Sequence, residues 1–117
     1  MDGIERFDIG ARISRAVAYR DIVFLAGQAS PEPVGDASAQ TAIVLGKIDE
    51  LLARAGSSKE RILFAQVHLA DMAHFDALNQ AWIAWLPTGA PPARTVVEAR
   101  LPRAEFLVEI TVVAVRG

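Results

Sequence analysis

One carboxylate interrupts the most apolar stretch of the chain. Glu109 stands in the segment LVEITVVAV, directly between Val108 and Ile110. A carboxylate is costly to bury without a partner, and successive residues of a strand point to opposite faces of a sheet. Glu109 is therefore either a structural residue, on a solvent face or paired with an arginine, or part of a functional site. The segment alone leaves both interpretations open.

Two further polar residues have the chemistry to bind a ligand. Arg94 follows Pro91, Pro92 and Ala93, so a stiff loop leads the guanidinium to the start of a strand. A guanidinium binds carboxylates through two parallel hydrogen bonds, and loops often carry ligand contacts. Taken alone, however, Arg94 is better explained as a surface arginine. Asn79 lies on the apolar side of a predicted helix, where bracing a loop is the simpler role for an amide.

The other polar residues form no known catalytic or metal-binding pattern. The chain has 2 histidines, His68 and His74, and their spacing does not suit a shared metal ion. It has no cysteine, which excludes disulfides and thiolate chemistry. A nucleophile elbow, a phosphate-binding glycine loop and a zinc signature are also missing from the sequence.

Composition limits the class of protein. The 117 residues suffice for one domain, which we take as 1–117, and 52% of them are apolar. The net charge is −2 and the basic residues are scattered, which argues against binding to nucleic acid. The N-terminal segment does not resemble a signal peptide, and no apolar run is long enough to span a membrane. We therefore expect a cytoplasmic protein with no nucleic-acid or membrane partner.

The elements that must position these residues follow from hydrophobic periodicity. Strands are predicted at 4–9, 16–19, 22–26, 62–70, 94–100 and 106–115, and helices at 38–55 and 72–86. The order β-β-β-α-β-α-β-β predicts an α+β fold, a mixed sheet with both helices on one face. The other face then needs a different cover, and the high apolar content favours an oligomer.

Local signals set the ends of the predicted helices. Asp36 or Ser38 can cap the first helix, and Gly56 follows its last turn, where a left-handed residue is favoured. Ser57 and Glu60 have the spacing of a capping box, which predicts one helical turn before the next strand.

Alternation predicts which side chains face the core. In the strand 62–70 the apolar side, expected to meet the helices, consists of Leu63, Ala65, Val67 and Leu69. In the second helix the buried side is expected to consist of Phe75, Leu78, Asn79, Trp82 and Leu86.

Several segments, taken in order, resemble the RidA family, also called the YjgF or perchloric-acid-soluble protein family. The matching pieces are Ser14-Arg15-Ala16-Val17, Ile22 to Gln28, Gln40-Thr41, Leu51-Leu52, Ala55-Gly56, His68 to Asp71, Phe75, Asn79, Pro92-Ala93-Arg94, Leu101-Pro102 and Val108-Glu109-Ile110. The resemblance implies a chorismate-mutase-like fold and a homotrimer with its sheets packed inward and clefts between subunits.

The resemblance also implies a function. Characterised relatives hydrolyse enamines and imines to 2-keto acids and ammonia without a cofactor. In them an arginine at the position of Arg94 holds the substrate carboxylate, and a glutamate at the position of Glu109 orients or activates water. We therefore predict Arg94 and Glu109 as catalytic residues that face one cleft, with Gly27 and Asn79 beside the small carboxylate substrate.

Three positions depart from the family pattern, and the segments Arg12-Ile13-Ser14 and Ala81-Trp82-Ile83-Ala84-Trp85 resemble a divergent branch similar to YoaB. Ile13 replaces the usual tyrosine, Ala26 replaces a serine and Val96 replaces a frequent cysteine. Ile13 and Ala26 are predicted to line a substrate pocket that is more apolar than usual. These losses also suggest an alternative, a trimeric protein that binds 2-keto acids without turnover. An endoribonuclease role, reported for some relatives, is least favoured by the acidic balance.

Overall fold

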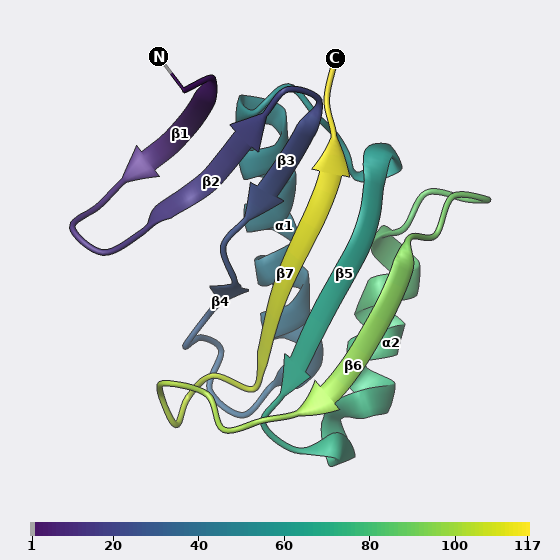
Figure 1. Ribbon diagram of the computed structural model, residues 1–117. Helices are drawn as coiled ribbons and strands as arrows, with labels where there is room; N and C mark the ends of the chain where they lie inside the picture. Colours follow the sequence, from purple (N-terminus) through teal and green to yellow (C-terminus); the bar gives the residue numbers. More distant parts are fainter. Residues whose placement is uncertain (1) are drawn as a thin grey trace.

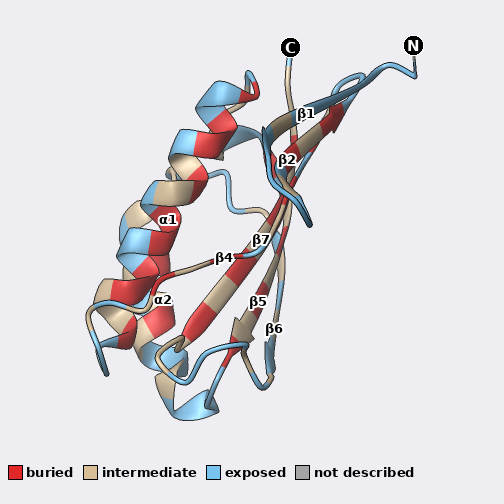
Figure 2. Ribbon diagram, turned by 90° about the vertical axis from the view of Figure 1, so that its left-hand side faces the viewer, coloured by how far each residue is buried: buried red, intermediate tan, exposed pale blue. Residues whose placement is uncertain are grey.

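Two helices cover one face of a mixed β-sheet in residues 2–117, the part of the chain that the computed structural model describes (Figures 1 and 2). The strands are β1 (Ile4–Ile9), β2 (Ser14–Tyr19), β3 (Ile22–Leu25), β4 (Gln28–Ala29), β5 (Ile62–Leu69), β6 (Ala93–Glu98) and β7 (Val108–Val115). The helices are α1 (Ala37–Arg54) and α2 (Phe75–Trp85). The predicted α+β architecture and element order are confirmed, with β4 as a short strand that the sequence did not predict.

The last strand lies in the interior of the sheet. The order of strands is β1-β2-β3-β7-β5-β6, and β4 also pairs with β7. Only β5 and β6 are parallel, and every other pair is antiparallel. In Figure 1, β7 runs between β3 and β5, and β1 and β6 form the two edges. The most apolar strand therefore has neighbours on both sides, which its composition favours.

The ends of α1 follow the predicted signals in part. The Asp36 carboxylate accepts a hydrogen bond from the Ala39 amide at 3.0 Å, so Asp36 is the N-cap. Gly56 has a φ of 85°, which a side chain would disfavour, so the C-terminal prediction is also confirmed. The predicted capping box is wrong. A short 3-10 turn does precede β5, but the Ser57 hydroxyl donates to the Val115 carbonyl at 2.6 Å instead.

The core lies between the two helices and the facing side of the sheet, where Figure 2 shows the buried residues. Leu78 and Trp82 of α2 are buried as predicted. Phe75 is not, because it opens α2 directly after a 3-10 turn and remains 39% exposed. Asp71, predicted to cap this helix, caps that preceding turn through a 2.8 Å bond from the Ala73 amide.

A bulge changes which residues of β5 face the helices. Ile62 pairs with Ala114 and Phe64 with Val113, so β5 has one residue more than β7 over this stretch. Ile62 is consequently buried, whereas Leu63, predicted on the helix side, is 50% exposed. The predicted faces hold from Ala65 onward, because the alternation is regular after the bulge.

A buried amide fixes the segment that leads into β7. Gln40 is fully buried in α1. Its Nε2 donates to the carbonyls of Pro33 and Glu105 at 2.9 and 3.0 Å, and its Oε1 accepts from the Leu107 amide at 3.0 Å. Both the Nε2 and the Oε1 of this buried amide therefore have hydrogen-bond partners. The bonds to Glu105 and Leu107 fix the segment just before Glu109.

The second face of the sheet has no cover from residues 2–117. Figure 2 shows both helices on one side only. The uncovered side, called the open face below, carries large apolar side chains that remain exposed in the single chain. Among them are Tyr19, Phe24, Leu63 and Val97, which are between 39% and 50% exposed. No helix within residues 2–117 is long and apolar enough to cross a membrane.

Candidate active site

Glu109 lies on the open face of β7. It pairs with Ala29 of β4 on one side and with His68 of β5 on the other. The alternation along β7 buries Val108 and Ile110 against the helices and leaves the Glu109 side chain 25% exposed. As a structural residue, Glu109 was expected either on a solvent face or beside an arginine. The structure places it on the open face, and its partner is a histidine.

The Glu109 carboxylate is held between two contacts. Its Oε1 lies 3.2 Å from Nδ1 of His68. On the other side, a Cβ added to Gly27 would lie 2.8 Å from the carboxylate carbon and 3.1 Å from Oε2. Gly27 therefore leaves the space that the carboxylate occupies, and any larger residue would displace it.

Arg94 lies on the other side of the sheet. It pairs in register with Ala65, a residue that faces the helices, and its side chain is directed toward α2. Its Nη2 donates to Oδ1 of Asn79 at 2.9 Å, and its guanidinium carbon lies 5.1 Å from the centre of the Trp82 ring. Asn79 thus braces Arg94 rather than a loop, and Trp82 provides a cation–π contact.

One nitrogen of Arg94 has no protein partner. Within the described residues, Nη1 is buried and makes no hydrogen bond. Burial lowers the pKa of the Arg94 guanidinium, since the charged form loses solvation. A buried, unpaired donor on a positive group is costly, and an anionic ligand would relieve that cost.

The two predicted catalytic residues do not face one cleft in the single chain. Arg94 shares the helix side with Ala65, whereas Glu109 is opposite His68, three residues further along β5. Positions an odd number of residues apart on a strand point to opposite faces. The two side chains therefore do not meet within one subunit, because the sheet lies between them, and a cleft that both face stays a prediction for the oligomer.

The remaining predicted pocket residues divide in the same way. Asn79 lies with Arg94, and Gly27 lies with Glu109. Ala26 precedes Gly27, and its amide donates to the Arg15 carbonyl at 2.9 Å. Ile13 lies in the turn between β1 and β2, near the opposite edge of the sheet from β6, and is 59% exposed. The chain thus holds the predicted residues Arg94 and Glu109 in two separate groups, one on each face of the sheet, which are called half-sites below.

His68 is the residue that sequence reasoning undervalued. It lies on the open face of β5, between the buried residues Val67 and Leu69, and the sequence does not predict its pairing with Glu109. The two residues are 41 positions apart, and the register between β5 and β7 is not visible in the sequence. Trp82, predicted as core or interface, is core and also contacts Arg94.

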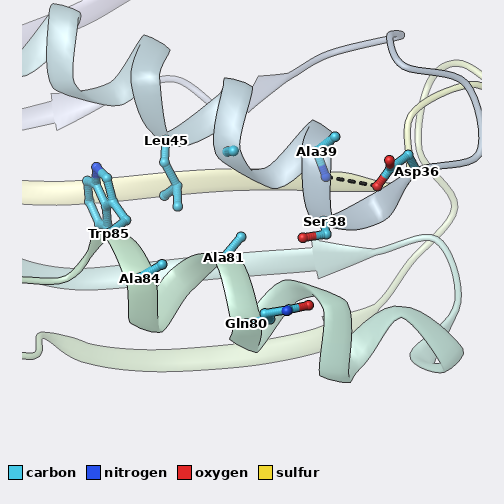
Figure 3. A pocket seen from close by; sticks show the side chains of 9 residues that line it. Asp36, Ser38, Ala39, Leu45, Gln80, Ala81, Ala84 and Trp85 are labelled. Carbon is cyan, nitrogen blue, oxygen red and sulfur yellow. Dashed lines mark hydrogen bonds between the residues drawn. The ribbon is translucent and has the colours of Figure 1, made fainter.

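A groove of about 510 Å³ lies between α1 and α2, and none of the residues of the two half-sites lines it (Figure 3). Its lining is mainly small, with Ala39, Ala81 and Ala84 beside Trp85. Asp36 at its end is engaged in capping α1, as the dashed line in Figure 3 shows. Among the described residues, no group of three or more histidine, aspartate or glutamate side chains could hold a metal ion.

Comparison with known proteins gives matches over nearly the whole chain. Residues 4–116 match the family model described as Endoribonuclease L-PSP. The RutC family protein YoaB of Escherichia coli K12 is 41% identical over 112 residues, which cover 95% of this chain and 96% of that protein. The crystal structure of NMB1025 from Neisseria meningitidis, a member of the YjgF protein family, superposes with a TM-score of 0.94 at 42% identity, covering 99% and 97% of the two chains.

One relative has a named activity. The 3-aminoacrylate deaminase RutC of Acinetobacter baylyi is 40% identical over 81 residues. The match covers 69% of this chain and 64% of that protein. Together, these similarities confirm the predicted fold and the family resemblance drawn from the sequence.

Proposed function

Because the chain belongs to the RidA/YjgF/L-PSP family, we propose that it is a cytoplasmic, cofactor-independent deaminase of small 2-imino or 2-enamino acids. The products would be a 2-keto acid and ammonia. The deaminase activity named for a RutC relative supports this reaction class. The substrate would share with 3-aminoacrylate a carboxylate and an enamine or imine nitrogen on a carbon near it.

The observation that carries the proposal is the environment of Arg94. Asn79 and Trp82 hold the guanidinium in place, and its Nη1 is buried without a partner in the described structure. A substrate carboxylate would accept from Nη1 and from the second hydrogen of Nη2. Such a fork of two charge-assisted bonds fixes the position of the neighbouring carbon.

Glu109 supplies the acid–base group. Water adds to the imine carbon, the C=N electron pair moves to nitrogen, and the carboxylate takes the proton that water loses. The same carboxyl group then returns this proton to nitrogen. It also relays the hydroxyl proton of the adduct to nitrogen as the C=O bond forms, the C–N bond breaks and ammonia leaves. A positioned acid–base residue of this kind is worth about 10²- to 10⁴-fold in rate.

We propose that Arg94 and Glu109 come together between subunits of a homotrimer. They lie on opposite faces within one chain, so a ligand that touches both needs two copies. Two features support this arrangement. Arg94 is on the edge strand β6, and Glu109 is on an open face with large exposed apolar side chains, a surface typical of an interface.

The test is to generate 2-imino acids with an amino-acid oxidase and to follow the release of keto acid and ammonia. We expect the wild-type protein to accelerate release. Arg94→Ala should lower kcat/KM by about 10²-fold or more, because a desolvated charge pair loses one partner. Arg94→Lys should recover only part of this loss, since an ammonium cannot form the fork.

Arg100→Ala is the matched control, because Arg100 is exposed beyond the end of β6. It should behave as wild type. If wild-type protein gives no acceleration over buffer with several imino acids, the deaminase proposal fails.

A second candidate is a trimeric protein that binds 2-keto acids without turnover. The lost polar groups at Ile13 and Ala26 favour it, since Ile13 is an exposed apolar side chain where relatives carry a tyrosine. This candidate predicts calorimetric binding of keto acids that Arg94→Ala abolishes, with no release of ammonia. Absence of keto-acid binding would count against both candidates.

An endoribonuclease, the activity in the description of the family model, is the least supported function. The net charge is −2, and RNA binding normally needs clustered basic residues. RNA cleavage that co-purifies with the protein and disappears in Glu109→Gln would reverse this judgement.

A further inference from the structure

Resting on the proposed deaminase function, we infer that His68 is the positioning residue that holds one oxygen of Glu109 and leaves the other free to exchange the proton. The inference starts from the contact between His68 Nδ1 and Glu109 Oε1, at 3.2 Å. Oε2 lies on the opposite side of the same carboxylate, next to Gly27. The two oxygens therefore have different surroundings and different roles.

His68 is the only charged or titratable side chain that faces Glu109 from the neighbouring strands of the described chain. On β5 the same face carries Gln66, and on β4 the residue opposite Glu109 is Ala29. On β6, one strand further away, the residue beside His68 is Val97. On β7 the next residue of this face is Thr111. No arginine or lysine competes for the carboxylate from these strands, so His68 alone decides its orientation there.

The geometry fixes which imidazole nitrogen carries the proton. A carboxylate accepts hydrogen bonds but cannot donate one when ionised, so the nitrogen beside Oε1 must be Nδ1–H. Partners of this kind set the tautomer and ring position of catalytic and metal-binding histidines. Here the carboxylate sets the tautomer of the His68 ring, and the ring in turn keeps the carboxylate from rotating.

Gly27 lies on the other side of the Glu109 carboxylate from His68. A side chain at position 27 would occupy the space of the carboxylate, so the glycine lets Oε2 approach the surface of the open face. Oε1 is engaged with His68, and Oε2 is the oxygen that takes the proton from water. The carboxylate thus reaches the substrate in one orientation, which removes the cost of ordering it during the reaction.

The kinetic test compares two substitutions of the same histidine. His68→Phe keeps a ring but has no donor, and we expect kcat to fall about 10- to 100-fold, the size of a lost hydrogen bond to a charged group. KM should stay within about twofold, since Arg94 still binds the carboxylate. His68→Asn places an amide nitrogen near the position of Nδ1 and should restore most of kcat. His74→Phe is the matched control, because the His74 side chain does not cap α2 and the pair with Glu109 involves only His68.

A double-mutant cycle separates positioning from packing. If His68 acts through Glu109, adding His68→Phe to Glu109→Gln should cause no further loss of kcat. Additive losses would contradict the inference, as would equal activities of His68→Phe and His68→Asn or a change confined to KM.

Nitrogen NMR of the imidazole rings tests the same contact without any turnover. The chain has 2 histidines, so His74→Phe assigns both rings. We expect the neutral His68 ring to carry its proton on Nδ1 in the wild type and to lose this preference in Glu109→Ala. A proton on Nε2 in the wild type, or no change in Glu109→Ala, overturns the inference. If the wild type shows no turnover, the proposed function fails while the NMR result still decides the role of His68.

Discussion

The two faces of the sheet belong to the same strands but differ in burial. On the helix side, Val67, Leu69 and Ile110 are fully buried under α1 and α2. On the open face, Phe24 is 49% exposed in the single chain although it is as apolar as those residues. The helices of the same chain bury the helix side. The open face has exposed apolar surface, which a second molecule would cover.

The chemistry is divided along the same line. Arg94 and Asn79 belong to the helix side at the sheet edge, whereas Glu109, His68 and Gly27 belong to the open face. A half-site on each face has no function in isolation under our proposal. The comparison therefore ties oligomerisation to activity, and each prediction below changes one face and leaves the other intact.

The largest effect is expected from a charge on the open face. Phe24→Asp would place a carboxylate among Val17 and Val113, its apolar neighbours in the sheet, and an unpaired buried charge is strongly unfavourable. We expect the mass from size-exclusion chromatography with light scattering to fall from trimer to monomer. Ile83→Asp, at a 71% exposed position of α2, is the control and should leave the mass unchanged. Equal masses for the two variants would show that the open face is not the interface.

A smaller effect distinguishes two leucines of the same strand. Leu69 is fully buried on the helix side, and Leu63 is exposed at the bulge. Leu69→Ala should lower the free energy of unfolding by about 2–5 kcal/mol, because it removes contacts and leaves a cavity. Leu63→Ala should cost less than about 1 kcal/mol when both variants are measured in the Phe24→Asp monomer, where Leu63 stays half-exposed. Urea denaturation at one protein concentration measures both, and equal losses would mean that the bulge is misplaced.

The smallest effect concerns an ion pair that ties β1 to α1. Arg54 makes two hydrogen bonds to the Asp8 carboxylate, each of 2.6 Å, and these bonds hold the pKa of Asp8 below its ordinary value of 3.8. A lowered folded-state pKa means that the contribution to stability is complete above pH 3.8 and is lost as the pH falls through the lowered value.

Asp8→Asn should therefore lower the free energy of unfolding slightly, and only where Asp8 of the wild type is ionised. The difference in this free energy between wild type and variant should stay constant near neutral pH and should shrink below pH 3.8. Because both side chains are partly exposed, high salt should weaken the difference. A difference that grows toward neutral pH would contradict the sign of this argument.

The sequence predicted the elements well because its periodicity is strong. The run from Val108 to Val115 alternates between buried and half-buried residues, and Glu109 lies on the half-buried side with Thr111 and Val113. The bulge at Leu63 was missed because Ile62 and Leu63 are both apolar, so composition does not distinguish the inward residue from the outward one. Strand β4 was missed because two residues are too short for a periodic signal.

The site was predicted residue by residue but not in its geometry. Family resemblance pointed to Arg94 and Glu109, yet the face that each occupies depends on the registers of β5 with β6 and with β7. Registers arise from contacts between distant segments, which a single sequence does not reveal. The same reason hid the contact of His68 with Glu109, 41 residues apart.

The central claim is that one active site takes Arg94 from one copy and Glu109 from another. The direct measurement mixes Arg94→Ala and Glu109→Gln chains by co-expression and assays imino-acid hydrolysis by the mixed oligomer. Each variant alone should be inactive. Random mixing should restore about one quarter of wild-type activity, since a site is intact only when the right variant stands on each side of it. Activity no higher than the sum of the two parents would contradict the claim.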